Sequence, residues 1–122
     1  MSRHDTVVRL RHMSDAATEV DALIRGGTRR SLDDDRKLML ALVQLVQIVG
    51  EAAARIPRET RDKYPSLPWT EIIGMRNRLI HGYDTIDLDI LWQVVSVDIP
   101  PLISELGRVI AMESSSSRSS AG

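Results

Sequence analysis

Cysteine is absent from the 122-residue chain. Without thiols, neither a disulfide framework nor a cysteine-ligated metal site can form, and a reducing compartment is the simple expectation. Aromatic residues are scarce, at two Trp, two Tyr and no Phe. A strong charge of one sign is also missing, because the formal net charge is −1. Any binding to RNA must therefore use a local basic patch.

Long hydrophobic runs are missing as well. The longest apolar stretch, residues 38–50, contains Gln44 and Gln47 and is shorter than the roughly 18 residues of a membrane span. Residues 1–6 pass directly into a mixed polar and apolar pattern, which differs from a signal peptide. We therefore expect a soluble, cytoplasmic protein with no membrane association, and the length suits one domain.

Helical periodicity dominates the chain, and no alternating strand pattern competes with it. Asp5 or Thr6 can cap the first helix, and Gly26-Gly27 can end it. The expected helices cover residues 6–25, 31–56 and 68–81, with a fourth pattern after residue 87 that Pro100-Pro101 bends or divides. We expect an all-α, up-and-down bundle of four to five helices over residues 1–112, and a disordered Ser-rich tail over 113–122.

The second expected helix is apolar around nearly its whole circumference from Leu38 to Ala53. Such a helix must be covered on every side, which predicts a homodimer through the apolar helices. A central bundle helix without an oligomer is the alternative. Glu51 is the one acid in this apolar region, as either a buried partner for Arg76 or a surface residue near the helix end.

Residues 69–83 place an Arg, an Asn, a His and a Tyr in one short stretch, which we interpret as the active site. On a helical wheel Arg76 falls within an apolar stripe, whereas Asn77, Arg78 and His81 form an adjoining polar sector. A guanidinium in that position needs a carboxylate, a phosphate or water. The alternative is that Arg76 pairs internally, for example with Glu51, and that His81 caps a helix end.

This set of residues excludes most common enzyme templates, because it has no acid pair, metal spacing, phosphate loop or activated nucleophile. Cleavage of RNA by its own 2′-hydroxyl needs only a base, an acid and a cation near the phosphorus. His81 can move the proton and Arg76 can hold the phosphoryl oxygens. Because one imidazole cannot readily act as both acid and base, a two-fold dimer would supply the second His81.

The loop over residues 55–68 holds the densest basic cluster, with Arg55, Arg58, Arg61 and Lys63. We expect Arg55, Arg58 and the motif residue Arg78 to contact RNA, with a solvated loop as the alternative. Tyr64 and Trp69 flank this loop and are expected to be packing residues.

The pattern Arg76-x4-His81-x-Tyr83, with Asn77 after the arginine, resembles the signature of the HEPN superfamily and of its HepT-like toxins. Further similarity lies outside the motif. It comprises Gly50-Glu-Ala52, Tyr64-Pro65, Pro68-Trp69, Gly74-Met-Arg-Asn77 and Asp98-Ile-Pro-Pro-Leu102, so that it spans about residues 6 to 112.

The resemblance implies the toxin of a type VII-like toxin–antitoxin module, a homodimeric, metal-independent endoribonuclease that uses no cofactor. It implies that Arg76 and His81 are catalytic and that Asn77 assists them. It also implies an MntA-like nucleotidyltransferase antitoxin, which transfers AMP to Tyr83. The alternatives are a packing role for Tyr83 and, for the whole chain, a non-catalytic helical binding subunit of a nucleotidyltransferase complex.

Overall fold

The computed structural model describes the backbone of residues 2–81 and 85–121, and the side chains of these residues except His81 and 116–121. Tyr83 lies outside the described residues. Most of the described chain is helical. The elements are α1 (Arg3–Ile24), α2 (Ser31–Asp34), α3 (Arg36–Ala54), α4 (Arg58–Lys63), α5 (Trp69–Leu79), β1 (Ile80–His81), β2 (Thr85–Ile86), α6 (Leu88–Gln93), the π-helix η1 (Val94–Asp98) and α7 (Pro100–Ala121).

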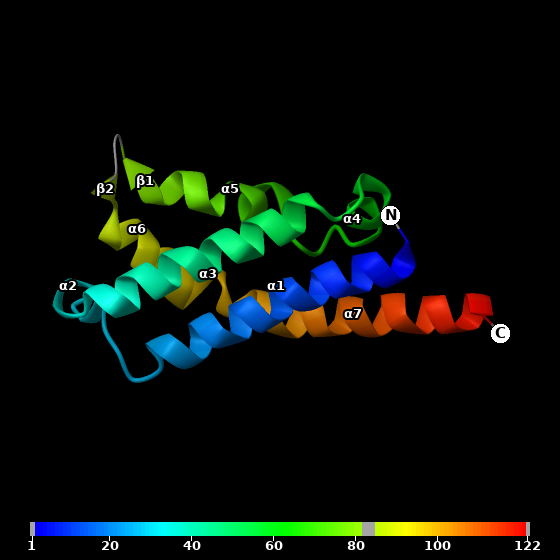
Figure 1. The fold of residues 1–122 in the computed structure, drawn as a ribbon, viewed down its shortest axis with the longest axis horizontal. Coiled ribbons are helices and arrows are strands. Elements are labelled where there is room, and N and C mark those ends of the chain that lie inside the picture. Colours follow the sequence, from blue (N-terminus) through cyan, green and yellow to red (C-terminus); the bar gives the residue numbers. More distant parts are fainter. Residues whose placement is uncertain (1, 82–84, 122) are drawn as a thin grey trace.

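The long helices form an up-and-down bundle, which confirms the all-α prediction (Figure 1). Helix α1 packs against both α3 and α7, and α5 packs on the other side of α3. Neighbouring helices run in opposite directions, so that the start of α1 and the end of α7 lie at the same end of the molecule (Figure 1). The short helix α4 lies near that end, and α2 lies at the opposite one (Figure 1).

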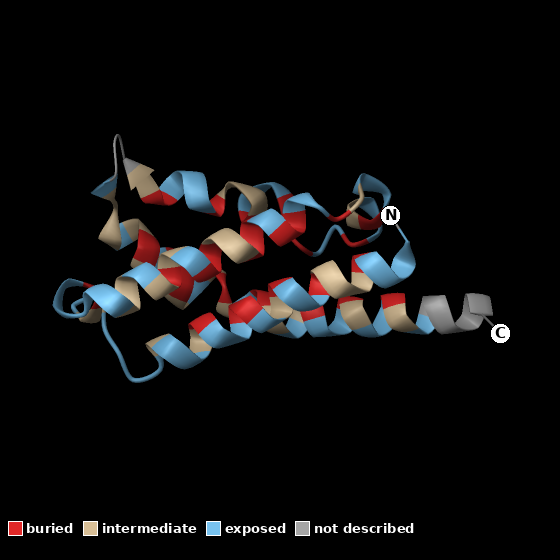
Figure 2. Cartoon of the chain, in the orientation of Figure 1, coloured by how far each residue is buried: buried red, intermediate tan, exposed pale blue. Residues whose placement is uncertain are grey.

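The core is aliphatic and lies between the long helices, where the buried faces meet (Figure 2). Each long helix contributes residues at three- and four-residue spacing, which is the pattern of an amphipathic helix. Fully buried side chains include Leu10, Met13, Val20, Leu42, Val46, Ile72, Leu79, Leu91, Leu106 and Val109.

Helix α1 begins earlier than predicted. Ser2 is its N-cap: the Asp5 amide donates to the Ser2 Oγ at 3.1 Å, and the Ser2 amide donates to the Asp5 Oδ2 at 3.4 Å. This capping box makes Asp5 the third helical residue, so the prediction of a cap at Asp5 or Thr6 was wrong. The predicted C-terminal glycine is confirmed, because Gly26 has a φ of 78°.

The second predicted helix is divided in two, because Asp35 has an extended backbone with φ −132° and ψ 96°. Its carboxylate accepts a hydrogen bond from the Leu38 amide at 3.0 Å and so caps α3. Ser31, which precedes three acidic residues and is therefore the cap that the sequence predicts, instead accepts a hydrogen bond from the Thr28 amide at 3.0 Å in the preceding turn. Any of several side chains in Ser-Leu-Asp-Asp-Asp can cap a helix, and the prediction chose the wrong one.

The predicted division of the last helix is confirmed. The Ile99 amide donates to the Val94 carbonyl at 2.9 Å, which is the five-residue step of a π-helix, and α7 begins at Pro100. Helix α7 continues to Ala121, and Glu113 on it is 1% exposed. The expected disordered tail therefore cannot begin at Glu113, because that side chain belongs to the packed bundle.

Helix α3 is the one described helix that is long and apolar enough to cross a membrane, with a mean hydropathy of 1.5 in its most apolar window. The sequence argument that no segment reaches this length was therefore too strict. Only 33% of that window is buried within the chain. The finding is weak evidence for a membrane span, because a core helix in a water-soluble bundle meets the same criteria.

Gly50 on α3 faces the backbone of α5 at short distance. A Cβ atom at this position would be 3.2 Å from the Ile72 carbonyl oxygen, whereas a Cβ atom at Gly107 on α7 would meet nothing within 4 Å. We predict that Gly50→Ala destabilises the fold by about 1–3 kcal/mol, because the two helix backbones must separate. The matched change Gly107→Ala should stabilise it by up to about 1 kcal/mol, since it adds helix propensity at an open site. Urea denaturation measures both, and equal effects would show that the close approach is unimportant.

Candidate functional site

The motif helix α5 has one buried and one exposed face. Ile72, Met75 and Leu79 are buried, and Arg76 and Asn77 are exposed. The prediction that Arg76 lies within the apolar stripe was therefore wrong. The buried arc of the helix is centred near Leu79, about 60° from Arg76 on a helical wheel, which leaves Arg76 at its edge, where a long side chain can reach water.

Arg76 is held by an amide on the neighbouring helix. Its Nε donates to the Gln47 Oε1 at 3.2 Å, and the Gln47 Nε2 donates to the Glu51 Oε1 at 2.9 Å. Glu51 is exposed and contacts Gln47, so of the two alternatives the surface residue is confirmed and the buried, direct partner for Arg76 is wrong. Among the side chains described, none accepts a hydrogen bond from either Nη atom of Arg76. Both terminal nitrogens can therefore bind an anion.

Arg78, two residues further along, is already paired. Its Nη2 lies 3.3 Å from the Asp98 Oδ2 on η1, and 44% of its side chain is exposed. An RNA phosphate that binds Arg78, as expected from the sequence, would compete with the Asp98 carboxylate for the guanidinium group. Arg78 is therefore less available to an anion than Arg76, whose described partner is a neutral amide.

His81 follows α5 directly, but it is not helical. Ile80 and His81 pair with Ile86 and Thr85 in an antiparallel ladder, and the Asp87 amide donates to the Leu79 carbonyl at 2.7 Å. The helical-wheel position given to His81 was therefore wrong, because the helix ends at Leu79. The backbone places His81 just beyond the turn that carries Arg76. Its catalytic role stays a prediction.

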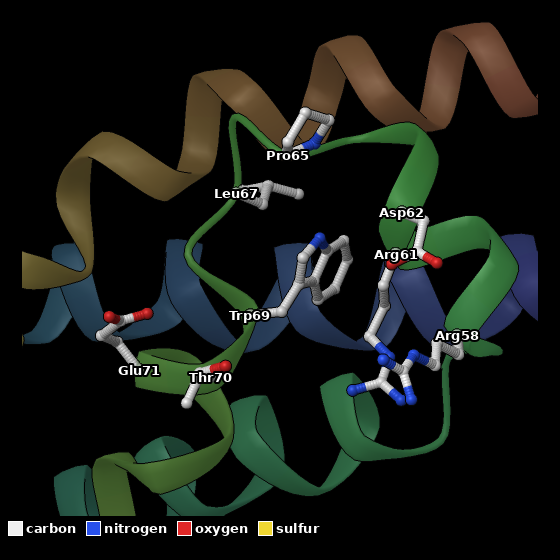
Figure 3. A pocket seen from close by; sticks show the side chains of 8 residues that line it. All are labelled: Arg58, Arg61, Asp62, Pro65, Leu67, Trp69, Thr70 and Glu71. Carbon is white, nitrogen blue, oxygen red and sulfur yellow. The ribbon is translucent and has the colours of Figure 1, made fainter.

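The basic loop contains one short helix, α4, and does not gather its arginines in one place. Arg55 lies beside Arg9 and Glu51 in a small cavity of about 100 Å³. Arg58 and Arg61 instead line a different cavity of about 510 Å³ (Figure 3). Arg55 and Arg58 therefore line different cavities, and the RNA contact of each one is a separate prediction.

The two aromatic residues that flank the loop are packing residues, as predicted. Tyr64 is 5% exposed and Trp69 is 8% exposed. The Trp69 indole Nε1 donates to the Tyr64 carbonyl at 3.0 Å, which ties the start of α5 to the end of α4. Neither ring is free to stack on a base.

Gln47 is a residue of the candidate site that the sequence did not point to. It stands four residues before Glu51, so the two side chains share one face of α3. That spacing was a usable signal, because a polar pair on an otherwise apolar helix is unusual. Within residues 2–81 and 85–121, no group of three His, Asp or Glu side chains could hold a metal ion.

Comparison with known proteins gives consistent matches. The family model described as "Ribonuclease HepT-like" matches residues 13–109, which includes α5 and the whole motif. A Methanocaldococcus jannaschii protein named "Putative RNase MJ1380" is 31% identical over 106 residues, or 87% of this chain and 97% of that protein. "Probable ribonuclease HepT" of Thermococcus cleftensis is 40% identical over 68 residues, or 56% of this chain and 62% of that protein.

A third relative is longer than this chain. "Gamma-glutamylcyclotransferase and putative RNase MJ0434" of Methanocaldococcus jannaschii is 32% identical over 108 residues, which cover 88% of this chain and 49% of that protein. No solved structure matches. The family model and the first relative each cover most of this chain, and the helical bundle agrees with them. The chain belongs to the HepT-like ribonuclease family.

Proposed function

We propose that the protein is an endoribonuclease that cleaves RNA through the neighbouring 2′-hydroxyl, without a metal ion. The observation that carries the proposal is the state of Arg76 in a chain of this family. It is exposed on the motif helix, its Nε is bound to Gln47, and both Nη atoms are open to an anion within the described structure. The relatives named as ribonucleases support RNA as the substrate.

The proposed reaction is an internal transfer of the phosphoryl group. A base removes the proton from the 2′-hydroxyl, and that oxygen bonds to the adjacent phosphorus. The bond from phosphorus to the 5′-oxygen breaks, and an acid protonates this leaving oxygen. The products are a 2′,3′-cyclic phosphate and a free 5′-hydroxyl. His81 supplies proton transfer, and Asn77 assists from the same exposed face as Arg76.

Arg76 stabilises the charge that develops on the phosphoryl oxygens. Because Gln47 holds the Nε, the guanidinium can present its two terminal nitrogens together to two oxygens. Glu51 fixes the Gln47 amide so that its oxygen, and not its nitrogen, faces Arg76. A neutral amide holds the arginine without cancelling its charge, as a carboxylate would.

A homodimer completes this site. Helix α3 carries more apolar surface than its own chain covers: Leu40 is 50% exposed, and Leu38, Met39 and Val43 are only partly buried. Gln47, further along the same helix, contacts Arg76, so a second copy packed on α3 would lie close to the motif. It would bring a second His81, so that one imidazole serves as base and the other as acid.

The products test the reaction directly. Purified protein is incubated in EDTA with a structured RNA, a single-stranded RNA and a 2′-O-methyl copy of the latter. We expect cleavage of unmodified RNA with cyclic phosphate ends, and no cleavage of the 2′-O-methyl copy, because its nucleophile is blocked. Cleavage of that copy, or activity that EDTA removes, would contradict the mechanism.

The regulation that we propose is that of a toxin in the cytoplasm, neutralised by an MntA-like nucleotidyltransferase antitoxin. Transfer of AMP to Tyr83 would place bulk and negative charge two residues beyond His81, where an RNA phosphate must bind. After co-expression with such a partner, mass spectrometry should find AMP on the peptide that contains Tyr83, and Tyr83→Phe should abolish it. Full neutralisation with an unmodified Tyr83 would show that the partner acts by covering the site instead.

A further inference from the structure

A second cationic site lies at the other end of α5 from Arg76. The cavity of about 510 Å³ is bounded by α4, by the loop that follows it and by the first turn of α5. Arg58 and Arg61 line it from α4, and their side chains point to the same part of the cavity, below the Trp69 ring (Figure 3). Asp62 and Glu71 also line the cavity, but their carboxylates point away from this pair (Figure 3).

No acidic side chain among the described residues pairs with the guanidinium group of Arg58 or of Arg61. Within the described part of the chain, neither Arg58 nor Arg61 forms a salt bridge, whereas Arg25, Arg29, Arg30, Arg78 and Arg108 each do. The Nε of Arg61 is buried and has no hydrogen-bond partner among the described atoms. Two like charges that line one cavity repel, and an anion that contacts both guanidinium groups removes this repulsion.

The cavity lies on the motif face of α5. Thr70, which lines it, and Asn77 are seven residues apart, so they share one face of the helix. Seven residues of α-helix rise about 10 Å, and a stacked single strand rises about 3.4 Å per nucleotide. A strand that passes Asn77, the neighbour of Arg76 in the motif, would therefore reach the cavity about three nucleotides away.

We propose that Arg58 and Arg61 form a phosphate subsite for the RNA strand, separate from the site of cleavage. This inference rests on the proposed function, because the strand that reaches the cavity is the one bound at Arg76. The ligand is a backbone phosphodiester, since the described lining offers two cationic forks and a hydroxyl but no exposed aromatic face for a base. The subsite sets how the strand lies across α5 without reading its sequence.

The test measures binding of a dye-labelled, 2′-O-methyl single-stranded RNA by fluorescence anisotropy, at several salt concentrations. The variants are Arg58→Gln, Arg61→Gln and the double change. Arg30→Gln is the matched control, because Arg30 is an exposed cation beside α2 at the far end of the bundle, 3.6 Å from Asp34. Arg58 is exposed, so its variant tests binding without disturbing the fold, and thermal melts check Arg61→Gln.

We expect each single variant to weaken RNA binding about tenfold, and the double variant to reduce the slope of log K against log salt by about 1 to 2. In cleavage assays KM should rise while kcat stays within about twofold. Arg30→Gln should change neither quantity. Competition with millimolar inorganic phosphate should leave RNA binding largely intact, which distinguishes a strand subsite from a site for free phosphate.

An unchanged salt slope in the double variant, or an equal loss in Arg30→Gln, would overturn the subsite. Failure of the subsite and failure of the ribonuclease proposal are distinguishable. If cleavage depends on Arg76 but not on Arg58 or Arg61, the subsite fails and the function stands. If no RNA is cleaved while binding still depends on Arg58 and Arg61, the subsite stands and the catalytic proposal fails.

Discussion

Replacing His81 with alanine is expected to lower kcat for RNA cleavage by about 10²- to 10⁴-fold, and Arg76→Ala by about 10²- to 10³-fold. The first change removes the group that transfers protons, and the second removes the cation at the phosphoryl oxygens. Initial rates in EDTA measure both effects. His12→Ala is the matched control, because it removes another imidazole, exposed on α1, and should leave kcat unchanged.

Mixing the inactive variant with the active protein tests whether the acid and the base come from two subunits. If each site needs both His81 side chains, a mixed dimer of wild type and His81→Ala is inactive. With random exchange at equal amounts, about a quarter of the dimers are wholly wild type, so activity should fall to about a quarter of that in undiluted wild type. A fall only to one half would show that each subunit works alone.

Equal background cleavage in wild type, Arg76→Ala and His81→Ala would remove the catalytic proposal. The chain would then be a helical binding subunit that keeps the ribonuclease scaffold without its activity. Gln47→Ala separates these cases further. Loss of the amide should lower kcat in an enzyme, because Arg76 loses its orientation, but it should have little effect on a docking surface.

The architecture could be predicted from the sequence because it follows from periodicity. The three- and four-residue spacing of Leu10, Met13, Ala17 and Val20 specifies a buried face for α1 wherever the helix begins. The bend near Pro100 could be predicted for a similar reason, since proline lacks an amide donor. Such features depend on local chemistry alone, and the structure reproduces them.

Helix ends were less predictable, because several side chains compete for them. Ser31 and Asp35 are both good caps, and the choice between them depends on how α2 and α3 pack. The helix that carries the motif ends at Leu79 because Ile80 and His81 join a two-stranded ladder. That pairing involves residues 85 and 86. The hydrophobic periodicity of the sequence does not show which residues of the motif they pair with.

The partners of the site residues were the hardest to predict, because they come from other elements. The sequence predicts that Arg76 needs a partner. It does not reveal that this partner is Gln47, which accepts from the Arg76 Nε, and that Glu51 contacts Gln47 instead of Arg76. Likewise, the sequence places Glu113 directly before four serines, which predicts that it begins a disordered tail. Its burial depends on Tyr64, 49 positions earlier in the chain.

Glu113→Ala is expected to destabilise the fold by about 2–3 kcal/mol, because it leaves buried polar groups without their partner. The carboxylate is 1% exposed and accepts hydrogen bonds from the Tyr64 hydroxyl at 2.7 Å and from the Lys63 Nζ at 2.6 Å. These contacts tie α7 to the segment at the end of α4. The magnitude is below that of a fully buried ion pair, since 50% of the Lys63 side chain is exposed.

The pH dependence of stability should have two limbs. Burial raises the pKa of Glu113, but the hydrogen bonds from Lys63 and Tyr64 outweigh it and hold that pKa below its usual value. The stabilisation is therefore present above the unfolded pKa of about 4.3 and is lost as the pH falls through the folded value. Burial raises the pKa of Tyr64 to about 12, with the hydrogen bond and the negative charge of Glu113 as the next largest causes. The contribution of Tyr64 to stability is therefore complete below its unfolded pKa of about 10, and it is lost as the pH rises toward 12.

Urea denaturation at several pH values measures both limbs. Tyr64→Phe should cost about 1–2 kcal/mol and remove the alkaline limb, while Glu113→Gln should remove the acid limb. Glu19→Ala, at an exposed position on α1, should change stability by less than about 0.5 kcal/mol. The effects of Tyr64→Phe and Glu113→Gln should not add, because the two residues share one hydrogen bond. Additive losses with an unchanged acid limb would show that Glu113 is buried without being bound, and that α7 is held by its apolar face alone.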